Sequence, residues 1–299
     1  MITPHKHRAA FLSLLSLSLL IGWRPLFETL ALSWKNDEYT HILLILPISV
    51  ALIFIERRFL QTTKDWDFRW GPVLLAAALA IACSVWLWPI PLNGDVRLSI
   101  FMFALVLWWM GSFVLCFGVQ AARSTLFSLL FLFGLVPLPA VALNGLISFL
   151  QSGSTWAAHG LFAAFGVPVV QDGFFLAIPG LTIQVAQECS SIRSSSMLLV
   201  TTLVLSQILL RSPWRKALVI GISVPLSIAK NGLRIFTIAM LAIRVDPGYL
   251  TGRLHHQGGI LFFVIALICI FALLAVLRKG DDSALASSVK LVGSASAVN

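Results

Sequence analysis

A thiol, a carboxyl group, a guanidinium group and several hydroxyl groups lie within one short segment between two long apolar runs. The segment reads Gln187-Glu188-Cys189-Ser190-Ser191-Ile192-Arg193-Ser194-Ser195-Ser196. The thiolate is the reactive form of cysteine, and a nearby cation favours it. Arg193 follows Cys189 by four residues, so a helix would place both on one face. Cys189 is therefore our candidate nucleophile.

The other cysteines have different surroundings. They lie inside hydrophobic runs with no ionisable residue beside them, which is typical of small buried apolar side chains; they are Cys83, Cys116 and Cys269. The chain contains no C-x-x-C pair and no Cys/His cluster, which argues against a disulfide framework or a structural zinc site. We expect neither a metal nor a cofactor.

The composition defines the class of protein. Of 299 residues, 59% are hydrophobic and 11% are charged, and the mean hydropathy is +0.94. A soluble core cannot hide so much apolar surface, so we predict an all-α polytopic membrane protein. The formal net charge of +9 does not indicate nucleic-acid binding, because the basic residues lie in short groups between apolar segments, as topology signals do.

Apolar segments of membrane length recur along the chain. We expect about eight transmembrane helices, at residues 9–23, 40–55, 71–90, 98–117, 124–136, 189–210, 217–240 and 258–277. The first resembles a signal peptide, but we predict a retained helix because further segments of this kind follow. Most basic residues fall in loops on one side of this topology; the opposite loops hold Arg24, Lys35, Arg97, Arg244 and Arg253. The positive-inside rule then places both termini in the cytoplasm.

The residues between the fifth and sixth expected spans are not plainly transmembrane. The prolines of Pro137-Leu138-Pro139 break a helix, and residues 144–165 have the polar interruptions of a helix at the membrane interface or packed against the bundle. Asp172-Gly173, between β-prone residues, predicts a hairpin, and Pro179-Gly180 predicts a second turn. We therefore expect a small extracytoplasmic β element that leads directly to Cys189.

The domain organisation predicted from these patterns is simple. Residues 1–280 form a single membrane domain, with no internal repeat. Residues 281–299 are rich in Ser and Ala and are predicted to be a disordered cytoplasmic tail.

The predicted topology brings three different reactive groups to one membrane depth. Cys189 begins the sixth span at its outer end. Arg234 and Asn231 lie in the outer half of the seventh span, and His255-His256 precedes the eighth. Charged residues inside spans are costly and usually mark a site or an ion path. Two structural alternatives remain: Arg234 could snorkel to the outer interface, and Lys230 could pair with a backbone carbonyl.

Three motifs occur in a characteristic order along the chain. They are residues 187–194, Asn231-Gly232-Leu233-Arg234, and residues 255–263, which begin His255-His256-Gln257-Gly258-Gly259. This set resembles the exosortase/archaeosortase family of membrane-embedded cysteine transpeptidases. Asp37-Glu38-Tyr39-Thr40-His41 and the proline break also fit the N-terminal pattern of that family, so the resemblance covers nearly the whole chain.

The resemblance implies a Cys, Arg, His catalytic set on the extracytoplasmic face of the bacterial inner (cytoplasmic) membrane. Cys189 matches the nucleophile and Arg234 the arginine. His255 matches the histidine by its spacing to the following Gly-x-x-Phe element, and His256 is the alternative. One departure is Ser191, where many members carry Gly; we expect its hydroxymethyl group to narrow the approach to the thiol without removing a catalytic group.

These groups can perform acyl transfer. The thiolate would attack a peptide carbonyl and form a thioacyl intermediate, the histidine would protonate the departing amine, and the arginine would stabilise the oxyanion. Supporting candidates are His256, Arg193, Asn231, Glu188 and His41. By resemblance, the substrate is an exported protein whose C-terminal sorting signal combines a Pro-Glu-Pro-like motif, one transmembrane helix and a basic cytoplasmic end. We expect such proteins and membrane lipids as partners, and no nucleic acid.

Two other function classes stay open. A polytopic transporter would also place Arg234 and Lys230 near a pathway, but it predicts polar residues at mid-membrane in several spans, whereas here they gather at the outer end. A non-catalytic scaffold for envelope assembly would explain the topology and leave the convergence of Cys, Arg and His to chance. Loss of function on removal of one sulfur atom would separate the enzyme from both.

Overall fold

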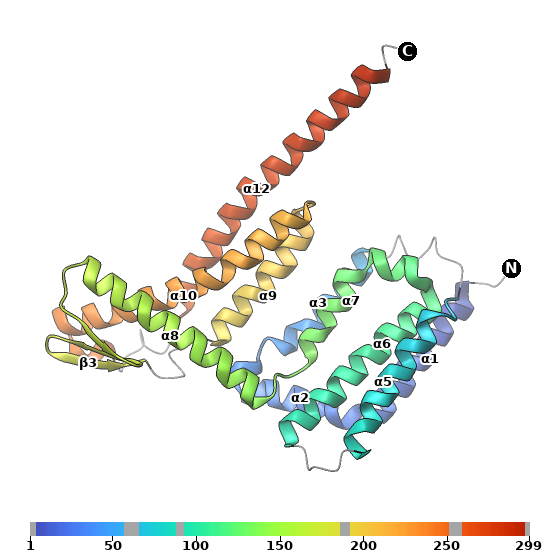
Figure 1. The fold of residues 1–299 in the computed structure, drawn as a ribbon, viewed down its shortest axis with the longest axis horizontal. Helices are drawn as coiled ribbons and strands as arrows, with labels where there is room; N and C mark the ends of the chain where they lie inside the picture. Colours follow the sequence, from blue (N-terminus) through green and yellow to red (C-terminus); the bar gives the residue numbers. More distant parts are fainter. Residues whose placement is uncertain (1–3, 57–65, 88–92, 186–191, 251–258, 297–299) are drawn as a thin grey trace. The chain divides into compact units, whose positions relative to one another are not determined.

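The fold was analysed in a computed structural model, which describes residues 4–56, 66–87, 93–185, 192–250 and 259–296. These residues are mostly helical, with one small antiparallel sheet (Figure 1). The elements in chain order are α1 (Pro4–Ile21), α2 (Trp23–Lys35), η1 (Asp37–Tyr39), α3 (Ile42–Ile55), α5 (Trp70–Leu87), α6 (Gly94–Ser124), α7 (Leu126–Phe131), η2 (Leu132–Leu135), α8 (Ala140–Ala164), β1 (Val170–Asp172), β2 (Phe175–Ile178), β3 (Leu181–Gln184), α9 (Ile192–Leu209), α10 (Pro213–Arg244), η4 (Pro247–Leu250) and α12 (Gly259–Ser296). The chain divides into two compact units, Met1–Asn144 and Gly145–Asn299, and each is described separately.

The described helices include five that are long and apolar enough to cross a membrane, or up to seven if each bent pair is one span. The five are Asp37–Ile55, Gly94–Ser124, Ile192–Leu209, Pro213–Arg244 and Gly259–Gly280; the bent pairs are Lys6–Ile21 with Trp23–Lys35 and Leu126–Leu135 with Ala140–Ala164. A shorter apolar helix covers Trp70–Val85. The chain is therefore a multi-span membrane protein, as its composition predicts. The number of eight spans and the cytoplasmic termini stay predictions.

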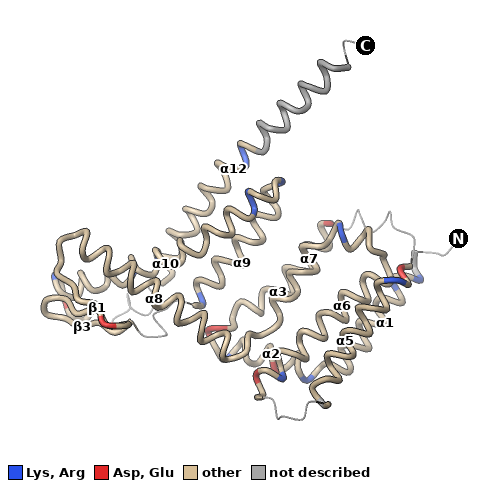
Figure 2. Tube along the Cα trace, viewed as in Figure 1, with Lys and Arg blue, Asp and Glu red and all other residues tan. Residues whose placement is uncertain are grey.

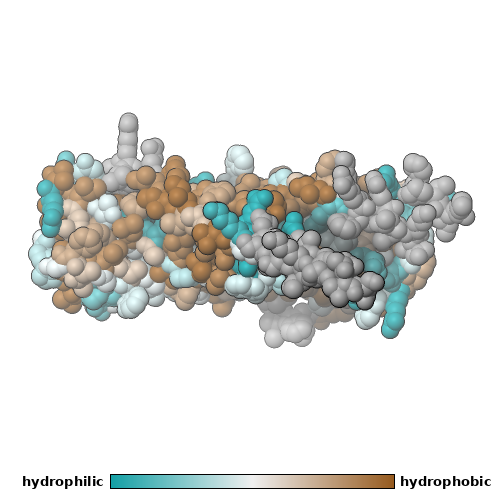
Figure 3. Space-filling model, turned by 90° about the horizontal axis from the view of Figure 1, so that it is seen from above, coloured by the Kyte–Doolittle hydropathy of each residue, from teal (hydrophilic) through white to brown (hydrophobic). Residues whose placement is uncertain are grey.

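The surface of the helices suits a lipid environment. Figure 2 shows most charged residues near helix ends, with long uncharged stretches between them. Large apolar side chains such as Val50, Leu79 and Phe271 are exposed, and hydrophobic residues cover much of the face seen in Figure 3. This apolar surface would be costly in water, whereas lipid chains can cover it.

In the first unit, α5 and α1 pack along α6 (Figure 1). The chain of α6 breaks at Gly118, whose φ of 81° and ψ of 163° belong to a region that only glycine adopts easily. At this break, carbonyl groups of the preceding turn lose their partners within the helix. His7 Nδ1 donates a hydrogen bond to the Cys116 carbonyl at 2.8 Å, and the Asp67 N–H donates to the Leu115 carbonyl at 3.1 Å. These contacts satisfy buried acceptors that the kink would otherwise leave unpaired.

The Pro137-Leu138-Pro139 segment separates η2 from α8, as the sequence predicts, and the two helical parts meet at 99°. Side chains from other elements bind the polar main-chain groups of this break. Asp95 Oδ2 accepts a hydrogen bond from the Ala140 N–H at 2.7 Å, at the start of α8. Ser99 Oγ donates to the first carbonyl of the segment at 2.7 Å, and the Tyr39 hydroxyl donates to the middle one at 2.9 Å. The bend is thus held without exposing unpaired backbone to lipid.

Helices α2 and α12 cover residues for which the sequence predicts a loop and a tail. The sequence predicts a loop after the first span, but Trp23–Lys35 forms α2, bent by 72° from α1 at Gly22. Helix α12 runs to Ser296, while its membrane-length apolar part ends at Gly280. The single membrane domain of residues 1–280 and the disordered tail of residues 281–299 stay predictions.

In the second unit, the predicted β element is a three-stranded sheet in the order β1-β2-β3. Asp172 pairs with Phe175 and Ile178 pairs with Leu181, so each hairpin has a two-residue turn. Gly173 and Gly180 supply the positive φ values of 56° and 82° that these turns require. Both turns predicted from the sequence are confirmed.

The sheet packs against two helices of the same unit. Its inward side chains join a core that includes Ala158 and Phe162 of α8 and Ile235 and Ala239 of α10. A second core joins α9, α10 and α12 around Leu198, Val219 and Ile270 (Figure 1). Helix α10 therefore contributes to both cores, and it carries the polar residues considered next.

Candidate functional site

A stripe of polar residues follows one face of α10, although the helix is long and apolar enough to span a membrane. The stripe consists of Ser223, Ser227, Lys230, Asn231 and Arg234, whose spacing of three or four residues matches one helical face. Lys230 is 6% exposed and Asn231 is 1% exposed, and Arg234 is half-buried. Because a buried ammonium group needs a polar partner, Lys230 must meet a polar group of a neighbouring element.

Lys230 has such a partner in the first turn of α9. Its Nζ donates a hydrogen bond to Ser194 Oγ, and this contact joins α10 to the helix that begins three residues after Cys189. The preceding residue, Arg193, is exposed. The backbone-carbonyl partner considered for Lys230 is thus not the contact that the structure shows; a serine hydroxyl takes that place. The contact fixes how α9 and α10 align beside the candidate site.

Helix α8 crosses α10 closely at Gly232, inside the Asn231-Gly232-Leu233-Arg234 motif. A Cβ atom on Gly232 would lie 2.6 Å from the Ala157 Cβ and 3.0 Å from the Ala158 main-chain nitrogen. Small residues allow membrane helices to approach in this way. The glycine of the motif therefore has a packing role, which leaves Asn231 and Arg234 as its candidates for chemistry.

Replacing Gly232 by alanine is expected to destabilise the folded chain by about 1–3 kcal/mol, because the added methyl group overpacks the contact with α8. The matched control is Gly221→Ala on the same helix, where a Cβ atom meets nothing within 4 Å. The measurement is the thermal midpoint of the detergent-solubilised chain. Equal midpoints for the two variants would show that the close crossing does not contribute.

Gln151 of α8 holds the end of β3. Its side-chain Nε2 donates a buried hydrogen bond to the Val185 carbonyl, and Val185 is itself buried. Val185 is the last described residue before residues 186–191. Gln151 is not among the site residues predicted from the sequence. The sequence pattern that could have predicted its burial is its spacing to Ser154, Thr155 and Ala158, which places it on the buried face of a helix.

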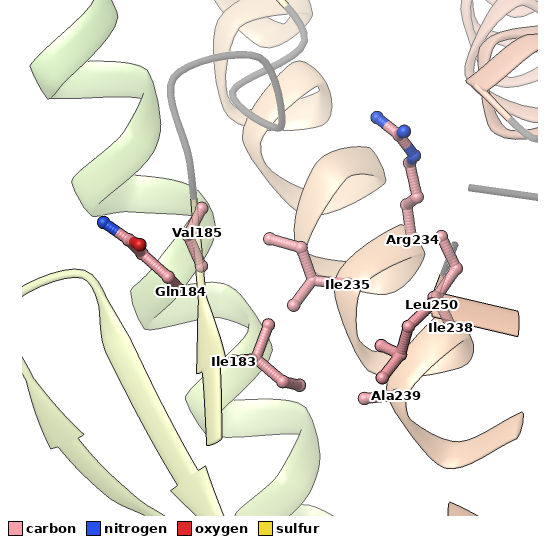
Figure 4. A pocket seen from close by; sticks show the side chains of 8 residues that line it. All are labelled: Ile183, Gln184, Val185, Arg234, Ile235, Ile238, Ala239 and Leu250. Atoms are coloured by element: carbon pink, nitrogen blue, oxygen red, sulfur yellow. The ribbon is translucent and has the colours of Figure 1, made fainter. Parts of the chain in front are cut away.

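A shallow hollow lies between β3, α10 and η4 (Figure 4); its space of about 420 Å³ includes the part that is open to solvent. Ile183, Gln184 and Val185 line it from the strand side, and Leu250 lines it from η4. Arg234 and three apolar residues of α10 complete the wall. Figure 4 shows Val185 and the Arg234 guanidinium group toward the same end of this group of residues. The hollow therefore combines an apolar wall with one cationic group, a combination that suits a peptide better than an ion.

The structure describes only part of the predicted catalytic set. Arg234, Asn231 and Arg193 belong to the second unit, and Arg234 lines the hollow. Cys189, Glu188, His255 and His256 lie outside the described residues. Among those described, no group of three or more His, Cys, Asp or Glu side chains could hold a metal ion.

His41, the remaining candidate, belongs to the first unit. It precedes α3 at its N-cap position, with helical φ and ψ, and its ring is half-buried. Its Nδ1 atom is buried and has no hydrogen-bond partner among the described residues.

The fold is that of a helical, multi-span membrane protein. Its candidate site combines the polar stripe of α10 with a hollow whose walls are mostly apolar. The sequence matches the transmembrane exosortase family over residues 34–272, and the chain belongs to that family. It is therefore a membrane-embedded sorting enzyme of the peptidase-like kind. No curated protein and no solved structure matches the chain.

Proposed function

We propose that this chain is a cysteine protease or transpeptidase that cleaves the C-terminal sorting signal of exported proteins through a thioacyl intermediate. Cys189 is the nucleophile, Arg234 stabilises the oxyanion, and His255 transfers protons, with His256 as the alternative. The observation that carries the proposal is the position of Arg234 on a hollow whose other walls include Val185 and Leu250.

Chain connectivity relates this hollow to the other proposed residues. Cys189 follows Val185 by four residues and His255 follows Leu250 by five. A fully extended chain spans at most about 3.6 Å per residue, so these Cα atoms lie within about 14 Å and about 18 Å of the two wall residues. Ile192, which begins α9, follows Cys189 by three residues and limits its position from the other side. We therefore propose that the thiol, the imidazole and Arg234 act on one bound peptide.

The proposed reaction proceeds in two steps. The Cys189 thiolate attacks the carbonyl carbon of the scissile peptide bond, the C–N bond breaks, and the histidine gives its proton to the departing amine. The histidine then takes a proton from water or from an acceptor amine, which attacks the thioester and releases the thiolate. Arg234 stabilises the oxyanion in both steps, and its half-buried setting strengthens that contact relative to water.

The proposed substrate is an exported protein with a Pro-Glu-Pro-like motif, one transmembrane helix and a basic cytoplasmic end. The proposed location is the bacterial inner membrane, with the site on the periplasmic side. Glu188, Arg193, Asn231 and His41 are supporting candidates. Of these, Asn231 has the clearest structural support, because it is buried next to Lys230 and one turn before Arg234.

Hydroxylamine provides the test of the thioacyl intermediate. Membranes containing the enzyme and an exported protein with such a C-terminus are incubated with and without hydroxylamine, and the new C-terminus of the product is identified by mass spectrometry. We expect a C-terminal hydroxamate, because hydroxylamine intercepts a thioester. Processing that yields only the carboxylic acid at every hydroxylamine concentration would contradict a thioacyl intermediate.

A further inference from the structure

Among the residues that the structure describes, no strand pairs with the outer edge of β3. In its pairing with β2, Ile178 lies opposite Leu181 across a two-residue turn, and the Val185 N–H donates to the Phe174 carbonyl at 2.9 Å. Because hydrogen-bonded and non-bonded pairs alternate in an antiparallel ladder, residues 181, 183 and 185 bond to β2. The main-chain groups of Thr182 and Gln184 therefore point to the outer edge.

These outward groups are available for pairing. Thr182 and Gln184 are both exposed, and within the described part of the chain no hydrogen bond uses their main-chain N–H or C=O groups outside the sheet. Proteins usually cover or blunt an open strand edge, because it pairs readily with another extended chain. Here the open edge lies directly before the segment that contains the proposed nucleophile.

The hollow borders the main chain of this strand. Gln184 lines it together with Ile183 and Val185, but the Gln184 side chain points away from Arg234 and Ile235 (Figure 4). Gln184 therefore lines the hollow with its main-chain atoms. A backbone segment paired with β3 would consequently lie beside an apolar hollow.

We propose that the outer edge of β3 and this hollow bind an extended segment of the exported substrate, which pairs with Thr182 and Gln184 as a fourth strand. One apolar side chain of the segment enters the hollow against Ile235 and Ile238. This inference rests on the function proposed above and specifies how the substrate is held.

The chemistry of the surface selects this occupant. The main-chain N–H and C=O groups of a strand edge form hydrogen bonds with another extended polypeptide. A lipid chain has no row of such groups and cannot replace it. A second copy of the chain, paired edge to edge, is the competing occupant, and cross-linking distinguishes it from the substrate. A substrate segment fills the hollow and uses the edge at the same time.

The positions of the lining residues also indicate where a segment paired with β3 would lead. Val185 and the Arg234 guanidinium group lie toward the same end of the lining residues (Figure 4). A chain that follows β3 toward its C-terminal end therefore passes Arg234. The next peptide bond of the substrate would meet the residues that we propose for catalysis.

The first experiment replaces Gln184 by proline in the full-length enzyme. Proline removes the outward N–H but no bond to β2, because Gln184 is at a non-bonded position of the ladder. The matched control is Gln171→Pro, which removes the equivalent outward N–H on the opposite edge strand, where Gln171 pairs with Leu176. We expect Gln184→Pro to raise KM for the substrate at least tenfold with kcat changed less than threefold, and Gln171→Pro to change KM less than twofold. Equal effects of the two variants would overturn the proposal.

The second experiment detects the contact directly and does not depend on loss of activity. A photo-cross-linking amino acid replaces Thr182, or Gln171 as control, in the full-length Cys189→Ala chain co-expressed with the tagged exported protein. We expect cross-links to the substrate from position 182 and not from position 171. Cross-links to a second copy of the chain, or to no protein, would overturn the docking proposal. If cross-links form but wild-type enzyme leaves the substrate uncleaved, the proposed function fails while the docking site stands.

Discussion

Replacing Cys189 by alanine is expected to abolish removal of the C-terminal signal from a co-expressed exported protein. The thiol is the nucleophile in the proposed reaction, and removing a nucleophile costs about 10⁴-fold or more in rate. The measurement is the gel mobility of the exported protein in membranes, because loss of the signal shortens it. The abundance of the variant is measured in parallel by immunoblotting, so that a folding defect is not mistaken for a catalytic one.

The chain offers a matched control for this substitution. Cys269 is a free, exposed cysteine on α12, and Cys269→Ala is expected to process the substrate at the wild-type rate. Cys189→Ser keeps the size of the side chain but replaces sulfur by a much weaker nucleophile, so it should also be inactive. Wild-type processing by Cys189→Ala would exclude the cysteine mechanism and direct attention to the transporter or scaffold alternatives.

Replacing Arg234 by alanine is expected to lower kcat by about 10²–10³-fold, the usual effect of removing an oxyanion donor. Because the guanidinium group acts mainly on charge that develops during the reaction, KM should change much less than kcat. Arg234→Lys retains the charge but not the planar, two-pronged donor geometry, and it should recover part of the lost rate. Both constants are measured with detergent-solubilised enzyme at fixed lipid content.

The control for Arg234 lies on the same helix. Arg244 is exposed at the end of α10, and Arg244→Ala should change kcat less than twofold. If Arg234 only snorkels to the interface, as one interpretation of the sequence allows, Arg234→Ala would leave kcat within tenfold of wild type and would alter membrane insertion or abundance instead. The two roles therefore give different results in the same pair of assays.

Several features follow from local sequence signals alone. The hydropathy of the apolar runs predicts the membrane-length helices, because lipid requires continuous apolar side chains and an internally bonded backbone. Asp172-Gly173 and Pro179-Gly180 predict both hairpin turns, because the positive φ of Gly173 and Gly180 is a property of those residues and their neighbours. The proline break before α8 is local for the same reason.

Other features depend on residues far apart in the sequence. The kink at Gly118 lies inside an apolar run that looks continuous, and it is supported by His7, which is 109 residues away from Cys116. Helix α2 lies between the first two expected spans, where the sequence predicts a loop. No local pattern reveals the kink, since it depends on which buried groups find partners in the folded unit. The helix of α2 has a local signal, because Trp23, Phe27 and Leu30 recur at helical spacing.

The same division applies to the site. The order of the motifs makes the chain similar to exosortases, and the family match over residues 34–272 establishes that membership. The resemblance in turn implies Cys189, Arg234 and either His255 or His256 as the candidate catalytic set. Only the tertiary structure decided that Lys230 bonds to Ser194, that Gln151 bonds to Val185, and that Arg234 lines an apolar hollow. Hydropathy and turn geometry are properties of neighbouring residues, whereas the partner of a buried polar group is chosen by how helices and strands pack.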